Sequence, residues 1–125
     1  MNALHMARSA YSAPNQTTMR TPRATEYAAF ARVTARLKEA ASGGKTAFPA
    51  LASALTENRR LWRLLACDVA QPDNALPADL RARIFYLYEF TDFLSQEVLA
   101  GRAKADDLIE INTAVMRGLD KPEAV

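Results

Sequence analysis

The sequence predicts an all-α fold, a small helical bundle of four main helices plus a short N-terminal helix. Ala, Leu, Arg, Glu and Lys are strong helix formers, and together they make up about half of the chain. Val and Ile number only 5 and 3, and Gly only 4, whereas sandwiches, barrels and parallel sheets need β-branched runs and turn glycines. Apolar residues also recur at alternating spacings of three and four, which is the period of a helix with one buried face.

The chain divides into three parts. Residues 1–20 are expected to form a short helix, over residues 2–11, and then a flexible linker, because residues 12–20 are polar and contain a proline. Residues 21–119 are expected to form the helical bundle domain. Residues 120–125 follow the last periodic segment and are expected to be a frayed tail.

The first helix of the bundle is predicted from Thr21 to about Ser42. Thr21 supplies an N-cap hydroxyl, and Pro22 fits the first helical position, where a missing N–H costs nothing. Gly43 and Gly44 stop the helix. Its apolar stripe comprises Tyr27, Phe30, Thr34, Leu37 and Ala41.

The second helix is predicted to open at Thr46, with Pro49 in its first turn. It ends before Pro72, because the residue that precedes a proline avoids the helical conformation. Leu61 and Leu64 widen its apolar stripe. That stripe comprises Phe48, Leu51, Leu55, Asn58, Trp62, Leu65 and Val69.

The third helix is predicted to begin with Pro77 at its first position and to end at Gly101. The last helix is predicted over residues 105–117, with Gly118 as its stop. The third helix has two apolar faces, so it is either central and covered on most sides or it lines a groove for a partner helix. One face comprises Leu80, Ile84, Leu87, Thr91, Leu94 and Val98, and the other comprises Phe85, Tyr86, Tyr88, Phe90 and Phe93.

The composition excludes several classes of site. Cys67 is the one cysteine and His5 the one histidine, so neither an intrachain disulfide nor a tetrahedral zinc site can form. Cys67 lies beside the apolar stripe of the second helix, and we expect a buried structural thiol. Glu89 and Asp92 are expected to be solvated or ion-paired. With no Gly-rich phosphate loop, HExxH, GxSxG or CxxC motif, the sequence predicts a protein that is not an enzyme and has no cofactor and no metal.

The hydropathy of the chain and its N-terminal residues indicate the cellular compartment. No apolar stretch reaches the ~20 residues of a membrane span. The N-terminus lacks the apolar core of a signal peptide. We therefore expect a cytoplasmic protein without a membrane partner.

The net charge of +2 hides an asymmetry. Residues 1–63 carry ten Lys or Arg and three Asp or Glu, a net of +7, whereas residues 64–125 carry six and eleven, a net of −5. A basic half can attract RNA or an acidic partner, or simply face the acidic half within one fold. Trp62 lies on the apolar stripe, so we expect it in the core rather than stacked on a base. The candidate residues for binding RNA or an acidic partner are Arg32, Arg36, Arg59, Arg60 and Arg63.

Three segments of the chain resemble the FlaF family of flagellar biosynthesis regulators. They read TPRATEYAAFARVTARL, NRRLWRLLACDVAQPDNALPADLRARIFYLYEFT and INTAVMRGL, and the opening MNALHMARSAY is similar to the start of that family. The order and spacing are most specific over residues 58–62, 74–81 and 111–119, and the resemblance covers residues 1–119. It implies a small helical protein, without catalytic residue or cofactor, that acts on flagellin together with the regulator FlbT.

The resemblance implies flagellin binding in the manner of a secretion chaperone, and it does not supply a residue-level site. Our hypothesis is that the third and last helices form a groove for an amphipathic flagellin segment, which the N-terminal helix covers through Leu4 and Tyr11 when flagellin is absent. The alternative is direct contact with flagellin mRNA through the arginines, and a purely structural flagellar subunit is disfavoured because long heptads are missing. The groove residues are Tyr86, Tyr88, Phe90, Phe93, Ile111, Val115 and Met116.

Overall fold

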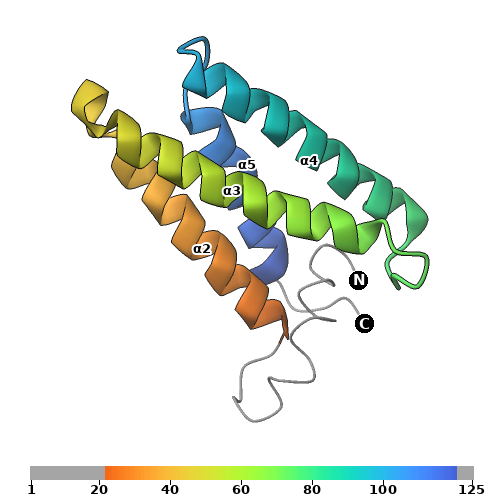
Figure 1. Cartoon of the computed structure of the whole chain (residues 1–125). Helices are drawn as coiled ribbons and strands as arrows, with labels where there is room; N and C mark the ends of the chain where they lie inside the picture. Colours follow the sequence, from red (N-terminus) through yellow and green to blue (C-terminus); the bar gives the residue numbers. More distant parts are fainter. Residues whose placement is uncertain (1–21, 121–125) are drawn as a thin grey trace.

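A computed structural model describes residues 22–120 and confirms the all-α bundle (Figure 1). In this range, four α-helices and one short 3-10 helix are present, and no strand is found. The predicted N-terminal helix and linker, and most of the predicted tail, lie outside the described residues. The elements are α2 (Pro22–Ala41), η2 (Gly44–Ala47), α3 (Phe48–Val69), α4 (Ala78–Leu99) and α5 (Asp106–Asp120).

The four helices do not contribute equally to the bundle. α2 packs against both α3 and α5, while α4 packs mainly against α3 and to a smaller extent against α5. Figure 1 shows α4 lying along the side of α3 away from α2. α4 is therefore an edge helix of the described bundle, and the interpretation of this segment as a central helix covered on most sides is wrong.

The apolar core has two clusters at opposite ends of the bundle. The first joins Leu37 of α2 and Leu55 of α3 to Leu94 of α4 and Leu108 of α5. The second centres on Phe30 and Trp62, whose rings meet edge to face with centroids 5.6 Å apart. Both clusters follow the middle of the predicted stripes. Stripe residues at helix ends are exposed instead, namely Tyr27, Ala41 and Phe48, and so is the widening residue Leu64, at 53%.

A buried polar network lies between the two clusters and joins three helices. The Asn112 amide nitrogen donates to the Asn58 side-chain oxygen at 2.7 Å and to the Thr34 hydroxyl at 3.1 Å. The Trp62 indole N–H donates to the Asn112 side-chain oxygen at 3.0 Å. Each of these four side chains is at most 3% exposed. One asparagine on α5 thus fixes the axial positions of α2 and α3, because every bond depends on the register of its helix.

The helix ends differ from the predicted ends in three places. α3 begins at Phe48 after the 3-10 turn η2, and the Thr46 hydroxyl donates back to Gly43 O at 3.3 Å instead of capping the helix. Pro77 is the N-cap of α4 rather than its first helical residue. α5 runs through Gly118 to Asp120, since one glycine inside a helix costs only about 1 kcal/mol. Gly101 ends α4 as predicted, with a φ of 78°.

The α3–α4 turn is held by Asn74. Its side-chain amide donates to the backbone oxygen and to the carboxylate of Asp68, each at 3.1 Å, and its side-chain oxygen accepts from the Leu76 N–H. The pKa of Asp68 is raised to about 6, mainly by partial burial and also by the nearby Asp73 carboxylate, while the Asn74 hydrogen bond opposes the shift. This turn sets where α4 starts beside α3.

The Asn112→Leu variant tests the buried network. Leucine has a similar volume but leaves the Trp62 N–H and the Asn58 oxygen buried without their partner. We expect the free energy of unfolding to fall by about 3 kcal/mol in urea denaturation. The control Thr113→Val removes a hydroxyl that bonds only within α5, and we expect a change within about 1 kcal/mol. Equal losses in the two variants would show that the network is dispensable.

Asp68→Asn tests the raised pKa. The folded carboxyl binds its proton more tightly than the ordinary value of 3.8 implies. The native protein is therefore more stable when Asp68 is protonated, and this contribution is lost as pH rises from 3.8 to about 6. Urea denaturation at neutral pH is expected to show Asp68→Asn as more stable than the natural protein. That advantage is expected to disappear below pH 3.8, and an advantage that persisted there would contradict the assignment.

Candidate functional site

The outer face of α4 carries large aromatic side chains that nothing in the described chain covers. Tyr86 is 63% exposed and Phe93 is 55% exposed, and Phe85 and Phe90 are each 39% exposed. The Tyr86 and Phe90 rings stack one turn apart, with centroids at 6.4 Å and an interplanar angle of 4°. Four exposed aromatic rings on the outward side of one helix are of the kind that marks a binding surface. We call Phe85, Tyr86, Phe90 and Phe93 the aromatic face.

The inner face of α4 explains why the aromatic rings point outward. It buries Thr91 and Ser95 beside Leu94 and Val98. The Thr91 hydroxyl donates to Tyr88 O at 2.9 Å, and the Ser95 hydroxyl donates to Thr91 O at 2.7 Å. Both hydroxyls are therefore satisfied within α4 itself, and their small size lets the helix lie close to its neighbours. The larger aromatic residues are left on the opposite face.

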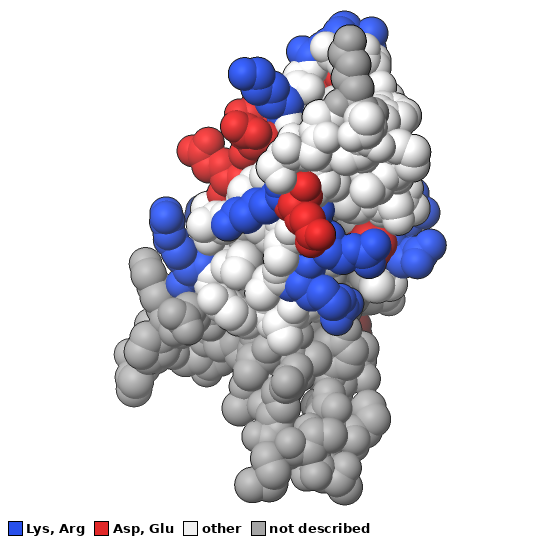
Figure 2. Space-filling model, turned by 90° about the vertical axis from the view of Figure 1, so that its left-hand side faces the viewer, with Lys and Arg blue, Asp and Glu red and all other residues white. Residues whose placement is uncertain are grey.

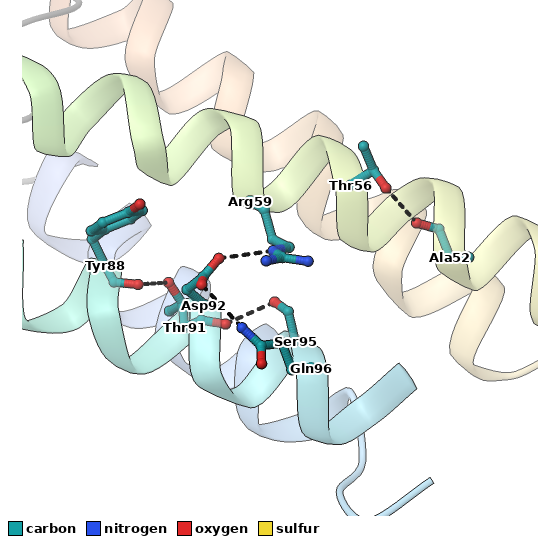
Figure 3. A network of polar contacts seen from close by, with 8 residues as sticks. All are labelled: Ala52, Thr56, Arg59, Tyr88, Thr91, Asp92, Ser95 and Gln96. Carbon is teal, nitrogen blue, oxygen red and sulfur yellow. Dashed lines mark hydrogen bonds and ion pairs between the residues drawn. The ribbon is translucent and has the colours of Figure 1, made fainter. Parts of the chain in front are cut away.

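An ion pair fixes the rotation of α4 against α3. The Arg59 Nε–H donates to one carboxylate oxygen of Asp92 at 2.8 Å, and the Gln96 amide donates to the other at 3.3 Å. Figure 3 shows Arg59 reaching from α3 toward Asp92 on α4, with the Gln96 amide of α4 below Arg59 in this view and bonded to the same carboxylate. Arg59 and Asp92 are each 29% exposed in their side chains. The expectation that Asp92 is ion-paired is confirmed.

The structure divides the seven predicted groove residues into two groups. Tyr86, Phe90 and Phe93 lie on the aromatic face. The other four are partly buried against the Phe30–Trp62 cluster and so pack inward beneath α4. This inner group comprises Tyr88, Ile111, Val115 and Met116.

The five candidate arginines do not form one free basic patch. Arg59 is paired with Asp92, and Arg36 forms an ion pair with Glu57. Arg32, Arg60 and Arg63 are exposed. Figure 2 shows one side of the molecule, where basic and acidic side chains lie next to one another. Trp62 is 1% exposed and belongs to the core, as expected.

Cys67 is exposed, so the expectation of a buried thiol is wrong. The expectation rested on its apolar sequence neighbours. Each residue turns a helix by about 100°, so Cys67 points roughly 200° away from Leu65, which is buried. The neighbouring Ala66 is 2% exposed and faces the core.

Other kinds of site find no support within residues 22–120. No cluster of His, Cys, Asp and Glu in this range could hold a metal ion. None of the described helices is long and apolar enough to cross a bilayer.

A shallow pocket on α4, beside the aromatic face, is lined by Tyr88, Glu89, Asp92, Phe93 and Gln96. Two further pockets lie near the α2–α3 corner and between α2 and α5.

Comparison with known proteins gives one family. A family model described as "Flagellar protein FlaF" matches residues 7–119, which is most of the chain, and confirms the resemblance seen in the sequence. No curated protein and no solved structure matches the chain. The matched range contains all of the aromatic face and all four side chains of the buried network.

Cys67 offers a test of the helix rotation. We expect a thiol reagent to label it in the native protein at nearly the rate seen in denaturant, because the thiol is exposed. A matched control moves the thiol by one residue, in the double variant Ala66→Cys with Cys67→Ser. That thiol faces the core and is expected to be protected until the protein unfolds. Strong native protection of Cys67 would contradict the placement of α3.

Proposed function

This chain belongs to the FlaF family of flagellar proteins, and from that premise we propose that it is a non-enzymatic regulator of flagellum biogenesis that binds flagellin as a secretion chaperone does. The observation that carries the proposal is the aromatic face of α4, where Tyr86 and Phe93 are more than half exposed. A folded protein rarely leaves so many aromatic rings in water without a partner for them.

The occupant we propose is an amphipathic segment of flagellin. Such a segment forms a helix in the filament and exposes an apolar stripe before export. A helix with anchors at i, i+3 or i+4, and i+7 can lie along Tyr86, Phe90 and Phe93, which have the same spacing on α4. Covering the stripe prevents premature association, and about 800 Å² buried on each partner is enough for a specific complex.

The inward residues of the original groove hypothesis have a supporting role in this proposal. Tyr88 of α4 and Ile111, Val115 and Met116 of α5 pack against the Phe30–Trp62 cluster. They hold α4 in place and leave the outward rings as the contact surface. We propose FlbT as a second partner and assign no surface to that interaction. The suggested cover by Leu4 and Tyr11 lies outside the described residues.

Direct RNA binding is the second candidate, and it rests on the exposed side chains of Arg32, Arg60 and Arg63. Two of the five candidate arginines are already ion-paired, so we rank this function below flagellin binding. The two functions differ in salt dependence. Affinity for a flagellin leader RNA falls steeply with salt through counterion release, whereas binding through an aromatic face changes much less.

The double variant Phe90→Ala with Phe93→Ala tests the proposed surface. Both side chains are substantially exposed, so we expect the thermal unfolding midpoint to stay close to that of the natural protein. Flagellin capture in a pull-down or by calorimetry is expected to fall at least about tenfold, because the two rings are central anchors. Phe48→Ala is the matched control, since Phe48 is 48% exposed on another helix.

Two outcomes would contradict the proposal. If the double variant unfolds, the two rings belong to the core and the binding surface lies elsewhere. If it folds and captures flagellin as well as the Phe48→Ala control does, the aromatic face is not the contact.

A further inference from the structure

Of the carboxylates around the aromatic face, some have a hydrogen-bond or ion-pair partner and one has none. Asp92 is bound by Arg59 and Gln96, and Glu97 is bound by Arg102 at 2.9 Å. Glu89 is exposed, and no described residue forms an ion pair or a hydrogen bond with it. It is thus the uncompensated charge on this part of α4.

Glu89 also has a central position. It lies three residues after Tyr86 and four before Phe93, so its side chain is on the same helix face, between the two most exposed rings. It lines the shallow pocket together with Tyr88, Asp92, Phe93 and Gln96. The pocket therefore combines two aromatic rings with two carboxylates, and one of these carboxylates is free.

We propose that the partner of α4 is an amphipathic helix that places a lysine or arginine among its apolar anchors, and that Glu89 selects it. The inference rests on the proposed function of the aromatic face and specifies the chemistry of the segment that binds there. The basic side chain enters the pocket, where it meets the Glu89 carboxylate and lies against the Phe93 ring. Both contacts favour a cation, the first by charge and the second by the ring quadrupole.

A second copy of this chain is a poorer occupant for the same reason. Glu89 lies close to the midpoint of α4, which spans Ala78–Leu99. Two copies packed antiparallel about a two-fold axis through this face bring Glu89 near the Glu89 of the other copy, and parallel packing does the same. Like charges facing each other at the centre of an interface oppose association. A cationic partner removes that conflict.

The test uses two model helical peptides with the same leucine stripe. One peptide carries lysine and the other glutamate at the position that packs over the pocket. Fluorescence anisotropy with the full chain measures both affinities. We expect the lysine peptide to bind about three- to fivefold more tightly, which is the range of one partly exposed ion pair, and the preference to shrink at high salt.

Charge reversal at Glu89 supplies the decisive comparison. Glu89→Gln is expected to weaken the preference, because only the contact with the Phe93 ring remains. Glu89→Lys is expected to reverse it in favour of the glutamate peptide. Because Glu89 is exposed, neither variant is expected to alter the thermal unfolding midpoint. Glu39→Lys is the control, since Glu39 is an exposed acidic residue on α2, and it is expected to leave the preference as it is in the natural protein.

The failure of this inference differs from the failure of the proposed function. An unchanged lysine preference in Glu89→Lys, or no binding of either peptide, overturns the role of Glu89. Flagellin capture that depends on Phe90 and Phe93 but not on Glu89 leaves the proposed function standing and overturns the inference. The third outcome is a lysine preference that depends on Glu89 in a protein that does not capture flagellin. It supports a basic partner helix and shows that this helix does not belong to flagellin.

Discussion

The Asn112 side chain is the contact on which the rest of the bundle depends. Its amide joins α5 to Thr34 of α2 and to Asn58 and Trp62 of α3. Apolar stripes tolerate sliding and rotation, because leucine packs against leucine in many registers, whereas a buried hydrogen bond is satisfied in only one. Loss of any one member destabilises the fold, because its partners stay buried without a hydrogen bond. The intact network specifies one arrangement of α2, α3 and α5.

α4 lies outside this network and is held by different means. Small buried hydroxyl residues, one ion pair to Arg59 and the Asn74 turn set its place beside α3. Ile84, Leu87 and Tyr88 are the α4 side chains that pack against the Phe30–Trp62 cluster, whereas the four residues of the aromatic face remain exposed. These exposed side chains are held by a helix at the edge of the described bundle and can contact a partner there. A helix that presents preformed anchors loses little conformational entropy when a partner binds.

Residues in the middle of a predicted apolar stripe were predicted well, whereas residues at the ends of a stripe and residues judged by their sequence neighbours were not. The stripe of α3 placed Leu55, Asn58 and Trp62 inside, and all three are buried. Cys67 was misplaced because its apolar neighbours in the chain point in other directions around the helix. Gly118 was misread as a stop because a single glycine is only a weak penalty, which the packing of α5 overcomes.

The sequence by itself determined the helical class, the four helices to within a few residues, the absence of an intrachain disulfide, and the family. These follow from composition, from the period of the apolar residues and from the order of specific segments, all of which are local along the chain. Only the tertiary structure decided which apolar face of α4 turns inward, and so which predicted groove residues are contacts and which are support. That choice depends on the shape of the surface that α3 and α5 present, and on the Arg59–Asp92 pair between residues 33 positions apart. Helical periodicity describes each helix alone and carries no information about its neighbours.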